Sequence, residues 1–446
     1  MGLNVEYCDI FHQSVGGYMY DLRVRDLGRF DVAVCGGGIA GTCAAISSAR
    51  AGAKTVLIER GGSLGGTLTE GFIPLILDAD NKGGIVRELF AFLDGHNMSL
   101  ARRGERVDKD GNRIFGRIVD TEGCQYFFDK ACIDAGVTVL FYSQASAVKM
   151  DNGKISDLLV VTECGNYSLK ADIYIDATGN GSLADLAGCE WECGDPDEKN
   201  ISPTSVAICA VGMPSEYDGT DSVEDKARYS AMLKENCIEI SGGLASVKKL
   251  PSLSLWNMGV NFQYNVMPDD ISSLSRATLE GRGESFEVIE AHKKISGYEK
   301  LYTAFTSAHI GIREGRRVFG EYRITDEDIL VGRRFDYAVC LVTFGVDVHK
   351  LKNDDTDECL RGYKTRPYNI SYRSLVPLGC DNLLLAGRCI SGDFYPHSSY
   401  RVMGNMAATG EASGYAAARC ANEKLTPRQY DGRKVCEFMK KQGYEI

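Results

Sequence analysis

The chain has 446 residues, of which 44% are hydrophobic and 25% charged, and its formal net charge is −11. This length exceeds what one hydrophobic core usually serves, so we expect two domains. The ordinary composition excludes a disordered protein, and an acidic chain without a basic stripe argues against nucleic-acid binding.

The 16 cysteines are scattered along the chain and predict neither disulfides nor a metal site. Disulfide frameworks occur in short secreted chains, whereas this chain is long and has no signal-peptide pattern. It contains no C-x-x-C, H-x-x-H or H-E-x-x-H spacing, which are the usual cluster and zinc patterns. No window approaches the roughly 18 apolar residues that a membrane span needs. We expect a cytoplasmic protein with reduced thiols and no metal.

Residues 1–29 are a polar lead-in, which we expect to be a strand or loop that lies over the domain. The next segment, FDVAVCGGGIAGTCAAISSARAGAKTVLIERGG, forms one compact unit. Its apolar pattern predicts a strand at 31–35, an Ala-rich helix at 39–51 and a second strand at 55–59. This order predicts a β-α-β unit of a parallel sheet.

The turn of this unit, GGGIAG at residues 36–41, satisfies the pattern G-x-G-x-x-G. Gly36 allows the tight turn, Gly38 lets the backbone approach a pyrophosphate, and Gly41 allows close helix–strand packing. The helix N-terminus offers free N–H groups and a partial positive charge to the phosphates. Glu59 follows roughly 20 residues later, where an acid can bind a ribose 2′-OH. The turn therefore predicts a dinucleotide site, and an acid at 59 argues against a 2′-phosphate.

The segment after this unit changes character twice. Two glycine pairs indicate a loop over residues 61–80, and residues 84–133 are predicted to be mainly helical, interrupted by the turn VDKDGNRIFG. Residues 137–175 are predicted to be strands, with turns at 151–153 and 165–166, because Asn-Gly between strand runs signals a hairpin. The glycine turn ATGNG follows.

Residues 200–370 contain mixed strand and helix patterns without a repeat, and we interpret them as the second domain. The stretch SLVPLGCDNLLLAGRCISGD then predicts a strand and a loop. The stretch GNMAATGEASGYAAARCANE predicts a helix rich in alanine and glycine.

Three segments resemble FAD enzymes of the glutathione-reductase-like superfamily. IERGGSLGGTLTEG resembles the E-R-x-x-x-x-G-G continuation, ADIYIDATGNG the strand that ends in A-T-G, and NLLLAGRCISGD the strand that leads to a Gly and an Asp near ribityl and pyrophosphate. With GIREGRRVFGEYRITDEDIL and PHSSYRVMGNMAATGEASG, the chain from about residue 30 resembles the FAD-dependent oxidoreductase family related to the flavin subunit of heterodisulfide reductase. It lacks that subunit's cluster-binding cysteine motifs.

The resemblance implies a set of FAD contacts. The glycine turn with Glu59 and Arg60 would hold the ADP half, and the backbone of Ala145 would meet the adenine. The helix that begins near residues 404–406 would point its N-terminus at the flavin, whose reduced form carries negative charge. Gly179 would lie near the diphosphate and Asp393 near the ribityl chain. The candidate FAD-binding residues are Gly36, Gly38, Gly41, Glu59, Arg60, Gly66, Thr67, Ala145, Gly179, Asp393, Asn405 and Met406.

His397 and Arg401, which precede the helix expected to begin near residues 404–406, are candidates for catalysis. His397 could move a proton near neutral pH, or it could instead satisfy backbone groups of its loop. Arg401 could anchor a carboxylate or stabilise reduced flavin, or it could pair with an acid such as Asp393. A thiol at Cys389 could exchange electrons with flavin, but that chemistry usually needs a second cysteine.

Arg313, Arg316 and Arg317 have a helix-like i, i+3, i+4 spacing. Such an arginine face could bind an anionic substrate. It could equally be a solvated face paired with Glu314 and Glu321, which is the alternative we favour.

We expect an α/β fold in which a Rossmann-like parallel sheet with a β-meander binds FAD and a smaller mixed α+β domain covers the flavin. The expected divisions are a lead-in at 1–29, a discontinuous FAD domain at 30–75, 120–200 and 375–425, a cap at 200–370, and a helical tail at 426–446.

The leading functional hypothesis is hydride transfer between FAD and a small organic substrate bound between the domains, with an anionic substrate as one option. The alternative is a flavin-bearing electron-transfer subunit that works with a redox partner protein. A flavin-dependent RNA-modifying protein is a third hypothesis, which the net charge of −11 disfavours.

Overall fold

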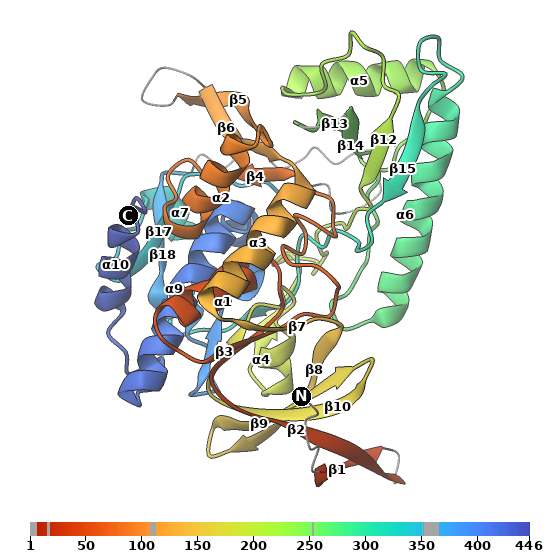
Figure 1. The fold of residues 1–446 in the computed structure, drawn as a ribbon. Helices are drawn as coiled ribbons and strands as arrows, with labels where there is room; N and C mark the ends of the chain where they lie inside the picture. Colours follow the sequence, from red (N-terminus) through yellow and green to blue (C-terminus); the bar gives the residue numbers. More distant parts are fainter. Residues whose placement is uncertain (1–6, 16–17, 108–112, 252–253, 350, 352–364) are drawn as a thin grey trace.

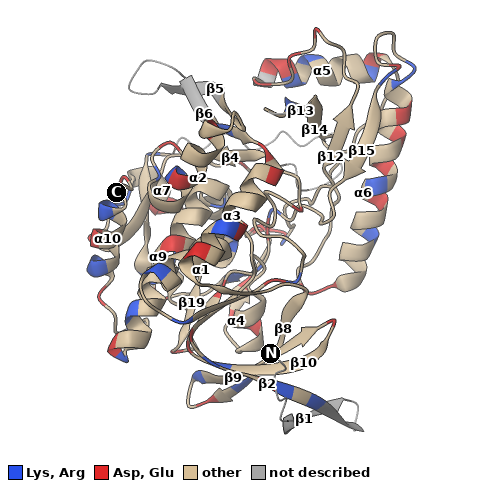
Figure 2. Ribbon diagram, viewed as in Figure 1, with Lys and Arg blue, Asp and Glu red and all other residues tan. Residues whose placement is uncertain are grey.

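The computed structural model describes residues 7–15, 18–107, 113–251, 254–349, 351 and 365–446. Figure 1 shows two bodies, a larger one built on a central sheet with helices and a smaller one that includes α6 (Ile271–His292). Among the helices so described, none is both long and apolar enough to cross a bilayer. Figure 2 shows Lys and Arg intermixed with Asp and Glu along α6 and α10 (Gly432–Lys441).

A parallel sheet lies at the centre of the larger body. Its strands run in the order β7-β3-β2-β10, and β19 pairs with the end of β10. These strands are β2 (Tyr18–Cys35), β3 (Thr55–Ile58), β7 (Thr138–Leu140), β10 (Gly165–Asp176) and β19 (Leu383–Leu385). β3 and β19 are buried along their whole length, and their sequences are almost entirely apolar. Strands of a parallel sheet that is covered on both faces have such sequences.

An antiparallel meander extends this sheet. β8 (Ser143–Asp151) and β9 (Lys154–Thr162) pair with each other, and β9 pairs with the first half of β10. The lead-in forms β1 (Tyr7–Val15) and the first half of β2, which pair as antiparallel strands. The α/β class, the parallel sheet and the meander predicted from the sequence are therefore confirmed.

Two helices from opposite ends of the chain pack together against this sheet. α1 (Ile39–Arg50) follows β2, and α9 (Met403–Glu423) begins more than 350 residues later. A Cβ on Gly410 would lie 2.0 Å from the Ala40 carbonyl oxygen, and one on Gly414 would lie 2.1 Å from that of Ala44. Glycine therefore lets the two helix backbones approach closely, and this contact joins the chain ends.

The prediction that residues 84–133 are mainly helical is only partly correct. α2 (Gly84–Gly95) and α3 (Thr121–Ala135) are helices, but the residues between them form strands. β5 (Ser99–Val107) and β6 (Arg113–Val119) pair, and β6 also pairs with β4 (Leu75–Leu77). The Asp-Gly pair in the turn between β5 and β6, whose residues lie outside the described parts, was a hairpin signal. Pairing with β4, a segment distant in sequence, outweighs helix propensity here.

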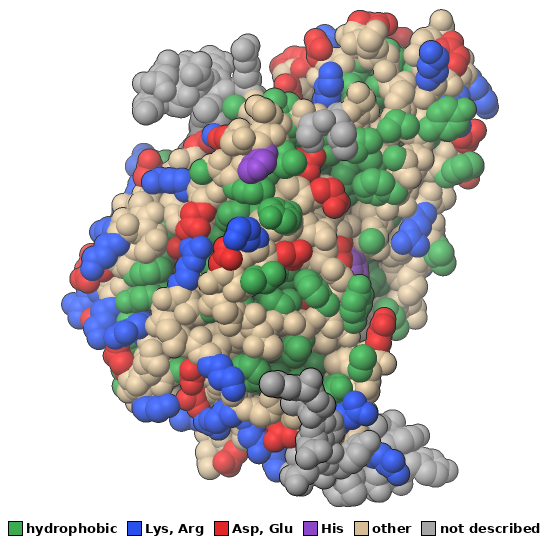
Figure 3. Space-filling view, viewed as in Figure 1, with side chains coloured by type: hydrophobic (Ala, Val, Ile, Leu, Met, Phe, Trp, Pro, Cys, Tyr) green, Lys and Arg blue, Asp and Glu red, His purple; other side chains and the backbone are tan. Residues whose placement is uncertain are grey.

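The smaller body has its own core. Its antiparallel sheet runs in the order β13-β14-β12-β15, and buried side chains such as Trp256, Met258 and Val288 lie beneath its helices. The elements are β12 (Ile208–Val211), α5 (Val223–Glu235), β13 (Ser246–Lys249), β14 (Leu255–Gly259), α6 (Ile271–His292) and β15 (Tyr302–Thr306). Figure 3 shows hydrophobic side chains exposed on this body as well. Leu279 and Phe286 of α6 are among the exposed hydrophobic residues.

The smaller body is shorter than the predicted span of 200–370. Residues beyond about 318, including Val318, Ile324 and Val339, are buried in the core of the larger body. β17 (Ala338–Val342) contacts both α9 and α10 (Gly432–Lys441), the helix formed by the C-terminal tail. The cap therefore comprises about residues 200–310, because its core ends near Leu301.

A buried ion pair in the larger body anchors the segment that follows β17. Lys82 Nζ lies 3.7 Å from Asp78 Oδ2, and both side chains are buried. Asp78 also accepts hydrogen bonds from the backbone N–H groups of Thr343 (2.9 Å) and Phe344 (3.2 Å). These bonds fix the course of residues 343–349 toward the site described below.

The remaining short elements are α4 (Ser182–Leu186), β11 (Trp191–Glu192), β16 (Arg317–Val318), α7 (Asp326–Val331), β18 (Tyr368–Ser371), the 3-10 turns at Tyr372–Leu375 and Gly387–Cys389, and α8 (Phe394–Tyr400).

Candidate functional site

A cavity of about 770 Å³ lies between the two bodies and is lined by both ends of the chain. One wall comes from the glycine turn after β2 and the segments after β3 and β10. Another comes from the start of α9, and the smaller body closes the rest through residues such as Asn257 and Phe262. A cavity of this size suits a cofactor and a small substrate. The early glycines and the late helix therefore share one site.

The three motif glycines have distinct structural roles. Gly36 has a φ of +99°, and a Cβ there would lie 2.5 Å from the Ala177 carbonyl oxygen. A Cβ on Gly41 would lie 1.8 Å from the Gly36 carbonyl oxygen. Gly38 differs, because a Cβ there would meet nothing within 4 Å, and Gly38 lines the cavity. The first and third glycines thus serve packing, while the second leaves space for a ligand.

Helix α1 and Glu59 offer polar groups at this end of the cavity. No side chain caps the N-terminus of α1, so a ligand phosphate can take that place. The Glu59 carboxylate accepts hydrogen bonds from the N–H groups of Gly37 (2.5 Å) and Gly61 (2.6 Å). Each carboxylate oxygen keeps a further lone pair for a ribose hydroxyl.

Most of the predicted FAD-binding residues reach the cavity. Its lining includes Gly36, Gly38, Glu59, Arg60, Gly66, Thr67, Ala145, Gly179 and Met406. Gly41 lies behind the turn, as its packing role requires. Asn405 is buried in the first turn of α9 outside the lining, and neither of its side-chain amide atoms has a hydrogen-bond partner among the described residues.

Asp393 is not where the prediction put it. It precedes α8, its carboxylate pairs with Arg323, and it does not line the cavity. Arg388, in the turn directly after β19, lines the cavity instead. A Cβ on Gly179 would lie 2.5 Å from Arg388 Nη2, so the guanidinium packs onto the glycine turn after β10. Counting from the end of the predicted strand would have identified Arg388.

Arg388 adds positive charge to the phosphate side of the cavity. Burial, followed by the nearby charges of Arg401 and Arg60, lowers the pKa of Arg388 to about 10. At that value Arg388 is still protonated at neutral pH. A diphosphate would relieve both its desolvation and this repulsion.

His397 is buried behind the lining and does not reach the cavity. Burial lowers the pKa of His397 well below its usual value, and the charges of Arg317, Arg401 and Arg388 add to this effect. The structure therefore does not bring His397 to the site as a proton carrier.

Cys389 is buried as well, and its thiol contacts the Asp176 and Ala386 carbonyl oxygens rather than the cavity.

The three spaced arginines do not share a helix face. β16 begins at Arg317, and the three side chains point to different partners. Arg316 pairs with Asp185, and Arg317 pairs with Glu314 and Glu192. Arg313 lines the cavity. The i, i+3, i+4 spacing was misleading because no helix forms here: Arg313 lies in a bend and only Arg317 lies in a strand, so the spacing does not place the three side chains on one face.

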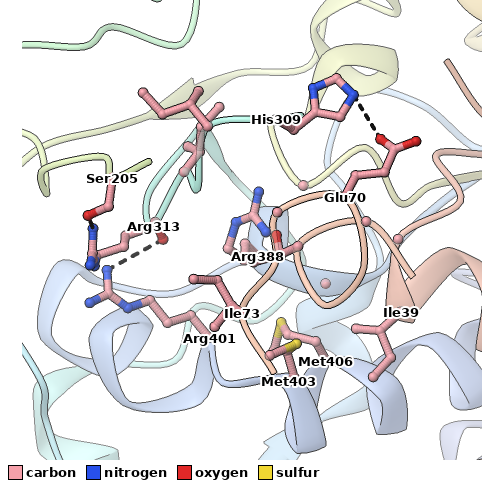
Figure 4. Close-up of a pocket in the computed structure, with 18 of the residues that line it drawn as sticks. Ile39, Glu70, Ile73, Ser205, His309, Arg313, Arg388, Arg401, Met403 and Met406 are labelled. Atoms are coloured by element: carbon pink, nitrogen blue, oxygen red, sulfur yellow. Dashed lines mark hydrogen bonds and ion pairs between the residues drawn. The ribbon is translucent and has the colours of Figure 1, made fainter. Parts of the chain in front are cut away.

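Arg313 and Arg401 lie side by side in the cavity (Figure 4). Arg313 Nη1 donates to the Pro203 carbonyl and to Ser205 Oγ, both at 2.8 Å, and its guanidinium lies 4.7 Å from the Phe262 ring centroid. Arg401 Nη1 lies 3.4 Å from the Arg313 carbonyl oxygen. Burial, then repulsion from Arg401, lowers the pKa of Arg313 to about 10, so it too is protonated at neutral pH.

Two acid–histidine pairs in the lining were not identified from the sequence. His349 Nε2 lies 3.4 Å from Asp347 Oδ2, beside the arginine pair. His309 Nε2 lies 2.8 Å from Glu70 Oε2, and this pair joins the smaller body to the loop after β3 (Figure 4). Burial alone would raise the pKa of Glu70, but the bond to His309 lowers it below its usual value. The residues of the Glu70–His309 pair come from separate segments, so no sequence spacing could have revealed it. Asp347 and His349 are two residues apart, and their Asp-x-His spacing was the signal that could have identified them.

Among the residues the structure describes, no group of three His, Cys, Asp or Glu side chains is placed to hold a metal ion. The uncapped helix, the open space at Gly38, Glu59 and Arg388 together fit the phosphates and ribose of a dinucleotide. The cavity fits FAD on these grounds.

Two proteins of known activity match parts of this chain in sequence. A thioredoxin reductase from Peptoclostridium litorale is 25% identical over 275 residues, which are 58% of this chain and 71% of that protein. A mitochondrial dihydrolipoyl dehydrogenase from Schizosaccharomyces pombe is 38% identical over 73 residues, 16% of this chain and 14% of that one.

Among solved structures, p-nitrophenol 4-monooxygenase from Pseudomonas putida matches with 12% identity and a TM-score of 0.48, covering 93% of this chain and 87% of that one. A geranylgeranyl bacteriochlorophyll reductase-like protein from Thermoplasma acidophilum matches with 15% identity and a TM-score of 0.45, covering 93% and 83%. The family model described as FAD dependent oxidoreductase matches residues 31–439. The chain thus belongs to the FAD-dependent oxidoreductase family, and it is an enzyme that uses FAD.

Proposed function

We propose that this enzyme transfers a hydride between FAD and a small organic substrate that carries a carboxylate. The observation that supports the substrate class is the Arg313–Arg401 pair in the lining of the cavity. Two guanidinium groups so close to each other repel, and a bound carboxylate would offset that repulsion. The planar guanidinium also matches a carboxylate in bidentate geometry.

The rest of the cavity supports placing the cofactor beside this pair. FAD, when bound, supplies hydride transfer. The α1 N-terminus, Gly38 and Arg388 would hold its diphosphate, and Glu59 would hold the adenosine ribose. The start of α9, which no side chain caps, would face the flavin and favour its reduced, negatively charged form. Arg401 directly precedes this helix start, so a carboxylate bound there would lie next to the flavin.

The proposal is tested by titrating the purified yellow protein with acetate, succinate and benzoate under anaerobic conditions. We expect carboxylates to perturb the flavin absorbance bands with a measurable Kd. Arg313→Gln should retain FAD and raise that Kd at least tenfold, because a charge-assisted bond is lost. The matched control is Arg428→Gln, which removes an arginine paired with Glu321 on the surface.

Three outcomes would contradict the proposal. A colourless protein that takes up no FAD would remove its basis. A flavin spectrum that responds equally to carboxylates and to neutral amides would remove the anionic substrate. Flavin that is reduced only when a second redox protein is added would favour the electron-transfer subunit instead.

A further inference from the structure

The residues Asp347 and His349 lie beside the arginine pair, and all four line the same cavity. Residue 347 is the link between them. Its backbone carbonyl accepts a 2.8 Å hydrogen bond from Arg401 Nη2, while its carboxylate lies 3.4 Å from His349 Nε2. A group bound by the arginines would therefore share this part of the cavity with the imidazole.

The His349 ring is held in place from two sides. It packs edge-on against Phe262, with ring centroids 5.2 Å apart, and Arg313 covers the same Phe262 ring. With Nε2 directed to Asp347, Nδ1 is the nitrogen available to a ligand, and no described residue bonds to it. The His349 side chain is only 22% exposed and lines the cavity. Nδ1 would therefore exchange a proton with a bound ligand more readily than with bulk solvent.

We propose that His349 is the catalytic base of this enzyme, that Asp347 positions it, and that the substrate is a 2-hydroxy or 2-amino carboxylate. This inference rests on the proposed function. Because carboxylate and base bind so close together, the reacting carbon is the one that bears the carboxylate. A substrate oxidised at a more distant carbon would place its hydroxyl or amino group beyond His349.

The reaction balances with these groups. The C–H bond of carbon 2 breaks, and its hydrogen leaves with two electrons to FAD, the oxidant. The proton of the 2-hydroxyl or 2-amino group passes to His349 Nδ1, and the freed electron pair forms a C=O or C=N bond. The substrate loses two electrons and two protons in total, and FAD gains the hydride.

The protonation state of His349 fits this role. Among the residues that the structure describes, the charged groups that act on its ring are Asp347, Arg313 and Arg401. Burial lowers the pKa of His349 to about 4, and the two arginines add to this effect while Asp347 opposes it. The imidazole is therefore neutral at pH 7 and ready to accept a proton. A bound carboxylate would offset the arginine charges and raise the pKa of His349, which favours proton uptake when substrate is present.

The test uses FAD-loaded protein mixed anaerobically with lactate, alanine and 3-hydroxybutyrate, with flavin bleaching as the rate and spectral perturbation as the binding signal. We expect bleaching by a 2-substituted acid only. His349→Gln should bind that acid with an unchanged Kd and bleach about 10²- to 10⁴-fold more slowly, as for loss of a general base. The control is His96→Gln, an exposed histidine that follows α2.

Asp347→Asn provides a second, independent readout. Because Asp347 raises the pKa of His349, its loss should move the acid limb of the bleaching rate to lower pH. If His349→Gln fails to retain FAD, this shift of the acid limb is the measurement that tests whether His349 is the base.

The results separate the two proposals. If carboxylates bind and bleach the flavin but His349→Gln reacts as fast as wild type, or 3-hydroxybutyrate reacts best, then the role of His349 is overturned and the proposed function stands. An acid limb that does not move in Asp347→Asn also overturns it. If no carboxylate perturbs the flavin at all, the proposed function itself fails.

Discussion

The two ends of the cavity are built in different ways. At the nucleotide end, backbone atoms and glycines form much of the surface, and helix N–H groups are joined there by the side chains of Glu59 and Arg388. At the other end, side chains such as Arg313, His349 and Arg401 form the surface, and each comes from a different segment. The first end presents backbone groups that suit any dinucleotide, whereas the second presents the side chains that we propose bind the substrate. If the two ends are built independently, a substitution can change folding, cofactor binding or the contact between the two bodies separately.

The largest effect is expected for Asp78→Ala, which tests whether residues 343–349 depend on the larger body. The change leaves Lys82 buried without its carboxylate and removes two backbone hydrogen bonds. Breaking a buried pair in this way costs about 3–5 kcal/mol. Denaturant unfolding measures it. A loss below about 1 kcal/mol would mean that the segment is held by other contacts.

Gly410→Ala tests the contact that joins the two chain ends. The new Cβ would lie 2.0 Å from the Ala40 carbonyl oxygen, so α9 must move away from α1. We expect a loss of about 1–3 kcal/mol in the free energy of unfolding, together with weaker FAD binding.

The matched change in the smaller body is Gly283→Ala on α6, where a Cβ meets nothing within 4 Å. It should stabilise the protein by up to about 1 kcal/mol, because alanine favours a helix interior. Equal effects of the two substitutions would contradict the packing role of Gly410.

Gly38→Ser separates folding from cofactor binding. The backbone at Gly38 has a φ of −62°, which any residue adopts, and serine is a favoured N-cap. The apoprotein should therefore be as stable as wild type. The added side chain occupies the space left for the ligand, so FAD affinity should fall at least tenfold, about 1.4 kcal/mol. Fluorescence titration with FAD measures this, and unchanged affinity would place the phosphates elsewhere.

The smallest effect is expected for Glu70→Gln, which weakens the ion pair between the two bodies. His309 is 40% exposed, so the pair should contribute about 0.2–1 kcal/mol at neutral pH. The folded pKa of Glu70 is lowered, so this stability is present above the unfolded pKa of about 4.3 and is lost as the pH falls through the folded pKa. The difference in unfolding free energy between wild type and variant should vanish in acid. A difference that persists in acid would assign the effect to packing.

The same contrast explains what the sequence could predict. The nucleotide end follows from local order, because strand, glycine turn, helix and acid are contiguous between residues 31 and 59. Arg388 was missed because the Gly-Asp pattern after the strand at 383–385 was matched at Asp393, five residues too late in the chain.

The other end of the cavity was predicted only in part. Arg401 and Arg313 were candidates for binding an anion, but their meeting with His349 depends on tertiary packing between separate segments. The strands β5 and β6 were missed although the Asp-Gly signal lay between them, and the pairing of β6 with β4 could not be read from local sequence.

The contact between α1 and α9 also has a consequence for synthesis on the ribosome. Ala40 and Gly410 are about 370 residues apart in the chain, and translation adds about 5–20 residues per second. The apolar face of α1 therefore stays uncovered for roughly 20–75 s, until α9 has been synthesised. Until then the nascent chain holds a finished glycine turn beside an uncovered surface, and chaperones have that interval in which to protect it.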